Sequence, residues 1–262
     1  MTSRDKQAAG RLGLAYAAMA YVIFVAVLLY TIGFLAGIGV PKGIDQGPHW
    51  GWPAAALTDL LLLALFAVQH SVMARPGFKR AWIRLVPPSA ERATYVLAAS
   101  LALALLLWLW RPINAAIWTT SGASADVLDG VYAFGWLVAL GSTFMISHFD
   151  LFGLRQAWLR ARGSAYASPP FTERGLYAMI RHPLMSGFVI VLWATPVMTA
   201  SHLLLAVAAT AYILVGIKFE EHDLGRDIGP AYSEYRSRVP ALVPSLRRDP
   251  LRRGLVHTRE TP

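Results

Sequence analysis

Polar side chains that could perform chemistry gather in four short groups, each at the end of an apolar stretch. The groups are Gln69 and His70, then Ser147, His148 and Asp150, then Arg181, His182 and Pro183, and finally Glu220, Glu221, His222 and Asp223. Histidine and carboxylate side chains can act as acids and bases, and arginine and carboxylate side chains bind charged ligands. If the apolar stretches are antiparallel membrane helices, all four groups meet at one face. Ionisable residues at such depths are costly, so this convergence predicts a functional site.

Each group taken alone also has a structural interpretation. His70 or His148 fits an interfacial cap or an interhelical hydrogen-bond partner. Glu220 and Glu221 fit the solvated end of a helix. The Arg181–Pro183 group fits a basic anchor in which the proline begins the next helix. The convergence of the groups, rather than any single residue, therefore carries the functional prediction.

The composition indicates a membrane protein. Apolar residues make up 56% of the 262 residues and charged residues 15%, whereas soluble domains average about 45–50% and about 25%. This excludes a disordered chain and a typical soluble domain. The chain has no cysteine, which excludes disulfides, a cysteine nucleophile and a Cys-ligated metal. No H-E-x-x-H or G-x-G-x-x-G motif occurs, so no metal site and no soluble-type dinucleotide domain is predicted.

We expect an all-α, polytopic membrane bundle that forms one domain over residues 1–262. Five to six membrane-spanning segments are predicted, because a span needs about 20 apolar residues and the last two segments are short. These two are expected to form a helical hairpin that bends near Pro196. The apolar segments are 14–38, 53–72, 93–110, 130–147, 184–199 and 202–217.

The positive charges predict the orientation. Of the 24 Lys and Arg residues, 22 lie on one side of the predicted bundle, and Lys42 and Arg111 lie on the other. This bias places both termini and the site in the cytoplasm, most simply of a bacterial inner membrane. It also explains the net charge of +9 without a nucleic-acid partner. The sequence offers no role for Asp59, which lies inside the second segment.

Two cytosolic loops and the C-terminal end carry further basic residues. Residues 76–86 and 153–163 mix aromatic or leucine residues with arginine and lysine, which predicts short helices lying on the membrane lipids. Residues 245–262 are expected to form a basic tail.

The C-terminal third resembles a known family of membrane enzymes. It contains G-L-Y from Gly175, R-H-P-L-x-x-G from Arg181, the pair Glu220–Glu221, and G-P-x-Y-x-x-Y-x-x-x-V-P from Gly229. In this order and spacing, these elements resemble the integral-membrane methyltransferases typified by the isoprenylcysteine carboxyl methyltransferases and the phospholipid methyltransferases. The resemblance implies S-adenosylmethionine as cofactor and residues 171–244 as the region that binds it.

Further strings narrow this resemblance. Q-H-S-V-M-A-R-P from Gln69, S-H-F-D-L-F-G-L-R-Q from Ser147 and R-H-P-L-M-S-G-F from Arg181 are similar to those of the methanethiol S-methyltransferases. That subgroup makes dimethyl sulfide, a volatile product of sulfur metabolism, from a small volatile thiol. Hydrogen sulfide and other small thiols stay open as acceptors.

The resemblance implies roles for named residues. Glu220 or Glu221 would accept hydrogen bonds from the cofactor's ammonium or ribose, and Arg181 or His182 would bind the cofactor's carboxylate. Leu176 and Tyr177 would line the adenine side, Pro183 belongs to the same motif, and Gly187 would let the backbone approach the ligand. His148, oriented by Asp150, is the first candidate for the base that forms the thiolate, and His70 is the second. Arg155 would stabilise the thiolate.

Three alternatives remain open at this point. The same fold could methylate a lipid or a prenylated carboxylate. The C-terminal hairpin is also similar to that of sterol reductases, which would require NADPH. A non-enzymatic transporter or assembly factor is a third interpretation, although a transport path would need polar groups through the full depth. The sequence does not indicate an oligomeric state.

Overall fold

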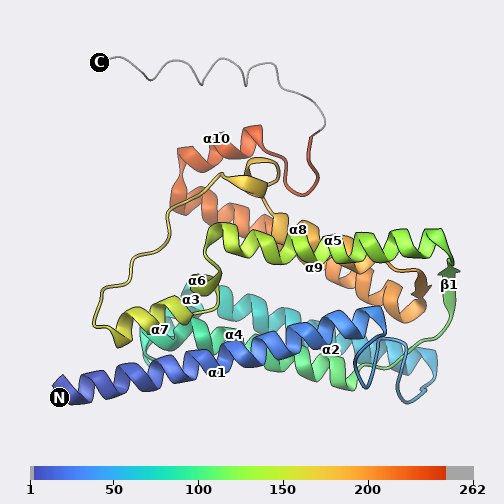
Figure 1. Cartoon of the computed structure of the whole chain (residues 1–262), viewed down its shortest axis with the longest axis horizontal. Coiled ribbons are helices and arrows are strands. Elements are labelled where there is room, and N and C mark those ends of the chain that lie inside the picture. Colours follow the sequence, from blue (N-terminus) through green and yellow to red (C-terminus); the bar gives the residue numbers. More distant parts are fainter. Residues whose placement is uncertain (1–2, 246–262) are drawn as a thin grey trace.

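The computed structural model describes residues 3–245, with side chains from residue 8, so the predicted basic tail lies outside the described residues apart from Ser245. The described chain is a helical bundle, as predicted, arranged in two layers (Figure 1). Helices α1, α2 and α4 form one layer, and α5, α8 and α9 form the other. In chain order the elements are α1 (Ser3–Ala36), α2 (Trp52–Ala74), α3 (Pro76–Trp82), α4 (Pro88–Leu109), β1 (Ala116–Thr119), α5 (Ala123–Ile146), α6 (His148–Leu151), α7 (Leu154–Ala161), η1 (Gly175–Ala178), α8 (Pro183–Trp193), β2 (Val197–Thr199), α9 (Ala200–Ile228) and α10 (Pro230–Arg238).

Five helices of the described chain are long and apolar enough to cross a membrane: α1, α2, α4, α5 and α9. Helix α8 has only 11 residues, which is about 16 Å and half of a bilayer core. The extended residues 194–199 carry the chain from the end of α8 to the opposite end of the bundle, where α4 stops. There β2 pairs with β1. Over residues 3–245 the chain therefore passes between the two ends of the bundle an even number of times, five times as a long helix and once as a half-length helix.

Proline and threonine determine where several helices begin. Proline occupies the first turn of α2, α3, α4, α8 and α10, where its missing N–H costs nothing. Thr199 caps the N-terminus of helix α9, because its hydroxyl accepts from the backbone N–H of His202 at 3.1 Å. The predicted bend near Pro196 is therefore a short extended segment that ends in a helix cap.

The two basic residues predicted for the opposite end lie there together. Lys42 Nζ donates to the carbonyl oxygens of Trp108 and Trp110, both at 2.7 Å, and so caps the C-terminus of α4. Asp59 is fully buried, and its Oδ1 accepts from the backbone N–H of Arg111 at 2.8 Å. Asp59 thus has a structural role, which is to hold the turn that follows α4.

Helices α5 and α8 are the most closely packed pair in the bundle. A Cβ atom on Gly187 would lie 2.5 Å from the backbone nitrogen of Ala139 and 2.6 Å from the carbonyl oxygen of Gly135. The missing side chain of Gly187 lets α5 and α8 approach each other, and the ligand approach predicted for Gly187 stays a prediction.

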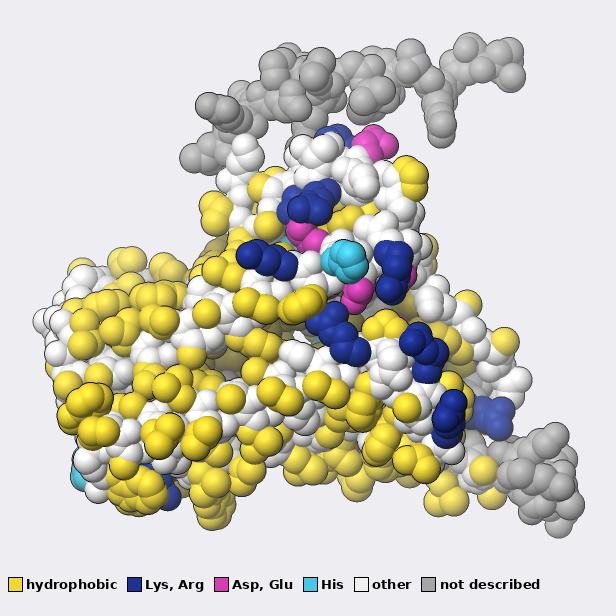
Figure 2. All heavy atoms as spheres, turned by 180° about the vertical axis from the view of Figure 1, so that it is seen from behind, with side chains coloured by type: hydrophobic (Ala, Val, Ile, Leu, Met, Phe, Trp, Pro, Cys, Tyr) yellow, Lys and Arg dark blue, Asp and Glu magenta, His cyan; other side chains and the backbone are white. Residues whose placement is uncertain are grey.

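The surface agrees with a membrane location. Large apolar side chains such as Leu57, Leu61 and Val68 on α2 are exposed along the bundle. In Figure 2 the bundle is mostly hydrophobic, and the basic, acidic and histidine side chains gather toward the end that carries α10. We call this end, where α2, α5 and α9 finish and α4 and α8 begin, the basic end. The predicted amphipathic loops form α3 and α7 at the same end.

Candidate active site

Arg181 and Glu221 form a buried ion pair at the basic end. Glu221 Oε1 accepts from Arg181 Nε at 2.8 Å and from Nη2 at 2.5 Å. The side chains are only 10% and 8% exposed. Arg181 precedes α8 and Glu221 lies within α9, so the pair joins the two arms of the hairpin. Glu221 is buried inside a helix that continues to Ile228, which excludes for Glu221 the interpretation of a solvated helix end.

The same arginine also anchors the segment that follows α10. Arg181 Nη1 donates to the carbonyl oxygens of Arg236 at 3.0 Å and Val239 at 2.5 Å. The backbone N–H groups of Arg181 and His182 donate to Pro240 and Ala241, and the Ser186 hydroxyl donates to Leu242 at 2.7 Å. The G-P-x-Y…V-P stretch is therefore a strap over the R-H-P motif. The Nε, Nη1 and Nη2 atoms of Arg181 are all engaged within the protein, so we assign it a positioning role.

Two charged side chains beside this pair stay accessible. His182 Nε2 lies 3.2 Å from Glu221 Oε1, and its Nδ1 lies 3.5 Å from Glu220 Oε2. The Glu220 side chain is 47% exposed. Arg236 Nε lies 3.3 Å from Glu221 Oε2, and its side chain is 58% exposed. One accessible carboxylate and one accessible guanidinium therefore flank the buried Glu221.

Tyrosines form the wall next to these charges. Tyr235 donates to the carbonyl oxygen of Tyr177 at 2.7 Å, and the buried hydroxyl of Tyr232 has no hydrogen-bond partner among the residues that the structure describes. Burial raises the pKa of Tyr177 and of Tyr235 to about 12, so both remain neutral phenols. Leu176 precedes Tyr177 in η1, and its backbone N–H lies 3.4 Å from the Met145 sulfur on α5.

His148 lies in a second cluster, on the other side of the last turn of α5. Its Nε2 lies 2.8 Å from the Tyr21 hydroxyl, and its Nδ1 lies 2.7 Å from the Thr143 hydroxyl. The ring stacks on Phe144 with centroids 4.1 Å apart, and Phe149 and Phe152 lie against it. Burial lowers the pKa of His148, which keeps the imidazole neutral at pH 7.

Asp150 and Arg155 contact each other. Asp150 Oδ1 accepts from Arg155 Nη1 at 3.0 Å, and Oδ2 accepts from the Tyr166 hydroxyl at 3.1 Å. Arg155 also donates to the carbonyl oxygen of Ala167. The expectation that Asp150 orients His148 is therefore replaced, because Thr143 and Tyr21 hold both ring nitrogens. The Asp150–Arg155 pair instead secures the loop that leads from α7 toward η1.

His70 lies in a third cluster, between α2, α4 and α9. Its Nε2 lies 2.9 Å from the Tyr95 hydroxyl, its ring stacks on Phe66, and Tyr212 lies edge-on to it. Nearby, Arg75 Nη1 lies 3.3 Å from Asp223 Oδ2. His70 therefore sits among the helices that support the ion-pair cluster.

The predicted convergence thus occurs as three neighbouring clusters rather than one constellation. The Arg181 and Glu221 groups are in direct contact. The last turn of α5 joins them to His148, because Ser142 interacts with the Tyr177 side chain while Thr143 contacts His148. Sequence reasoning missed Tyr21, Arg236, Tyr232 and Tyr166. The strap motif G-P-x-Y-x-x-Y offered a signal for Tyr232, whereas nothing in the apolar α1 distinguished Tyr21.

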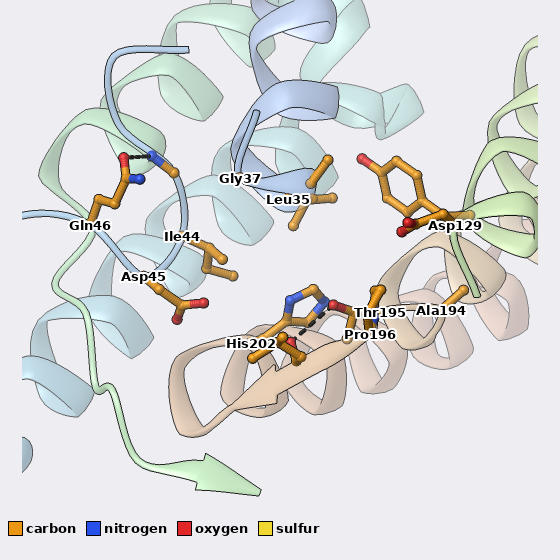
Figure 3. A pocket seen from close by; sticks show the side chains of 14 residues that line it. Leu35, Gly37, Ile44, Asp45, Gln46, Asp129, Ala194, Thr195, Pro196 and His202 are labelled. Atoms are coloured by element: carbon orange, nitrogen blue, oxygen red, sulfur yellow. Dashed lines mark hydrogen bonds between the residues drawn. The ribbon is translucent and has the colours of Figure 1, made fainter. Parts of the chain in front are cut away.

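A cavity of about 260 Å³ lies at the opposite end (Figure 3). Asp45 and Gln46 line one side of it, and Asp129, Thr195 and His202 line the others. His202 Nε2 donates to the carbonyl oxygen of Leu192 at 3.0 Å. Because none of the predicted site residues lines it, we place the candidate active site at the basic end.

Comparisons with known proteins show the family of the chain. The family model described as NnrU protein matches residues 60–239. The chain is 53% identical to methanethiol S-methyltransferase 2 of Bradyrhizobium diazoefficiens, over 89% of this chain and 90% of that protein. It is 50% identical to methanethiol S-methyltransferase of Mycobacterium tuberculosis, over 87% of this chain and 94% of that protein. A nurim homolog of Drosophila pseudoobscura is 31% identical, over 63% of this chain and 68% of that homolog. No solved structure gives a significant match.

Proposed function

The chain belongs to the methanethiol S-methyltransferases of the NnrU family, and we propose that it converts methanethiol to dimethyl sulfide with S-adenosylmethionine as methyl donor. As a member of this family it is a methyltransferase. The observation that carries the finer proposal is the pair of accessible charges, Glu220 and Arg236, on either side of the buried Glu221. A ligand that carries both an ammonium and a carboxylate matches such a pair.

The described residues fit S-adenosylmethionine. Glu220 would bind the ammonium of its amino-acid end, and Arg236 would bind the carboxylate. The unpartnered Tyr232 hydroxyl would gain a partner from the same polar end. Leu176 and the neutral Tyr177 would face the adenine. When bound, the cofactor supplies a methyl group that its positively charged sulfur already activates, so the chain's task is to position the acceptor and to remove its proton.

The His148 cluster fits the acceptor. Phe144 and Phe149, which border His148, are 62% and 54% exposed on the apolar surface, so a small apolar thiol can reach them from the lipid. Thiolates, not thiols, are the nucleophiles in such reactions, and the neutral His148 is the proposed base. A dry, membrane-level site also favours a step in which a negative thiolate and a positive sulfonium lose their charges.

The acceptor contributes little to binding. Even the best small ligands gain at most about 1.5 kcal/mol per heavy atom, and methanethiol has two heavy atoms. We therefore expect weak thiol binding, and most of the binding energy comes from the cofactor. A dissociation constant for methanethiol below one micromolar would contradict this part of the proposal.

The proposed location follows from the charges. The basic end faces the cytoplasm of a bacterial inner membrane, in accordance with the positive-inside rule. S-adenosylmethionine then reaches Glu220 and Arg236 from the cytoplasm, while the thiol and the volatile sulfide pass through the lipid.

Calorimetry on the detergent-purified protein tests the cofactor assignment. We expect S-adenosylmethionine to bind, NADPH not to bind, and Glu220→Gln to weaken S-adenosylmethionine binding about 10- to 100-fold through the loss of a charge-assisted contact. Glu234 on α10 is also exposed, at 73%, and Glu234→Gln is the matched control that should bind normally. Binding of NADPH alone would favour a reductase. Cofactor binding without methanethiol turnover would favour a lipid or prenylated acceptor.

A further inference from the structure

The tautomer of His148 can be worked out from its neighbours. The Thr143 hydroxyl has a single hydrogen, and it donates this hydrogen to the carbonyl oxygen of Leu140 at 2.6 Å. Toward His148 Nδ1, which lies 2.7 Å away, the same hydroxyl can therefore act only as an acceptor. Nδ1 consequently carries the ring hydrogen, and the lone pair of the neutral imidazole lies on Nε2.

The atom that faces this lone pair is the Tyr21 hydroxyl, at 2.8 Å. With Nε2 as an acceptor, Tyr21 must donate to it. Thr143 and Tyr21 therefore engage both ring nitrogens, and aromatic rings surround the imidazole. His148 itself is only 7% exposed. A thiol cannot contact Nε2 unless it displaces Tyr21, whereas the Tyr21 oxygen keeps a free lone pair.

We propose that Tyr21 is a catalytic residue that takes the proton from the thiol and simultaneously passes its own proton to His148. This inference rests on the proposed function and adds a residue to the same site. The S–H bond breaks and its electron pair stays on sulfur, which becomes the nucleophile for the methyl group. The thiol proton forms a new O–H bond on Tyr21, the former Tyr21 proton binds Nε2, and the resulting imidazolium later releases one proton to water.

The surroundings support this relay. The side chains around His148 come from three parts of the chain. Tyr21 lies on α1, Thr143 and Phe144 lie on α5, Phe149 lies on α6, and Phe152 directly follows α6. The nearest charged pair, Asp150 and Arg155, is internally bonded and faces Tyr166. Tyr21 and Thr143 are therefore the groups that bond to the imidazole, and Thr143 has a positioning role that fixes the tautomer.

A substitution pair on one helix tests the proposal. Tyr21→Phe should lower the rate of dimethyl sulfide formation at pH 7 about 100-fold, within the usual range for general acid–base catalysis, and leave the S-adenosylmethionine affinity within about twofold. The loss should shrink at high pH, where thiolate forms without help. Tyr16→Phe is the matched control, because Tyr16 also lies on α1 and bonds across the bundle to Thr94 at 3.0 Å. The Tyr16→Phe variant should lose this hydrogen bond but keep the wild-type rate of dimethyl sulfide formation.

The tautomer of His148 can be measured by nuclear magnetic resonance, independently of enzymatic activity. With ¹⁵N-histidine labelling, the His148 signal, identified by its loss in His148→Gln, should show hydrogen on Nδ1 in the wild-type protein. Thr143→Val should disturb this tautomer, and Thr143→Ser should restore it. Hydrogen on Nε2 in the wild-type protein, or full rate in a folded Tyr21→Phe variant, would overturn the relay. If the wild-type protein formed no dimethyl sulfide although His148 had the expected tautomer, the proposed function would fail rather than the hydrogen-bond assignment.

Discussion

Arg181 and Glu221, which are 40 residues apart, meet at 2.5 Å between Nη2 and Oε1 and lie at the centre of the basic end. The same guanidinium holds the strap at Arg236 and Val239. This arrangement separates the buried residues that build the site from those that remain accessible to a ligand. Arg181 and Glu221 belong to the first kind, and Glu220 and Arg236 belong to the second.

We first predict that breaking this ion pair destabilises the protein. Arg181→Ala leaves Glu221 buried without its main partner, which typically costs about 3–5 kcal/mol, so the thermal unfolding midpoint in detergent should fall clearly. Arg238→Ala is the control, because its ion pairs with Glu173 and Glu234 are exposed and such pairs contribute little. Equal midpoints for the two variants would contradict the assigned role of Arg181.

A second prediction concerns cofactor affinity. Arg236→Gln should raise the dissociation constant of S-adenosylmethionine about 10-fold or more, because a charge-assisted hydrogen bond to its carboxylate is lost. Arg226→Gln is the control: Arg226 is similarly exposed on α9 and pairs with Asp227. Unchanged affinity in Arg236→Gln, measured by calorimetry, would remove Arg236 from the site.

A third prediction tests the close contact between α5 and α8. Gly187→Ala adds a methyl group where Ala139 already lies, and overpacking of this kind costs about 1–3 kcal/mol. In Gly216→Ala, the new methyl group meets no atom within 4 Å, and the change should stabilise α9 by up to about 1 kcal/mol. Thermal unfolding of the two variants should therefore shift in opposite directions.

The pH dependence of the rate supplies a fourth prediction. Burial lowers the pKa of His148 below its ordinary value, which is about 6.5. The base is protonated and inactive only below that lowered pKa, so kcat/KM should stay high as the pH falls to 6.5 and should decline at more acidic pH. The same shift makes folding less favourable below pH 6.5, because the unfolded chain binds the proton first. An acid limb centred above pH 7 would exclude His148 as the base.

Periodicity and charge predicted the bundle well but not the ends of its elements. Apolar runs located all five long helices, and the charge bias placed Lys42 and Arg111 together. Hydropathy alone would end helix α9 before Glu220, but the helix continues to Ile228. Ion pairs of Glu221 with Arg181 and Arg236, and of Glu220 with His182, stabilise its polar residues. The β1–β2 pairing was not predicted, since it joins two short segments that are distant in sequence.

The site shows the same division. Motif resemblance predicted Arg181, His182 and the glutamates as site residues, and the structure brings them into contact with one another. The resemblance did not reveal that the Nε, Nη1 and Nη2 atoms of Arg181 all hydrogen-bond within the protein, or that Gly187 packs against α5. Tyr21 reaches His148 across 127 positions, and one tyrosine in a long apolar helix carries no periodic signal. Such contacts become visible only when tertiary packing is known.

The most direct test of the central claim follows the methyl group. The detergent-purified protein is mixed with methanethiol and with S-adenosylmethionine that carries a deuterated methyl group, and the headspace is analysed by gas chromatography with mass detection. The account predicts dimethyl sulfide that carries one deuterated methyl group, formed with the wild-type protein and strongly reduced with Glu220→Gln. Absence of labelled dimethyl sulfide from folded protein that binds S-adenosylmethionine would contradict it.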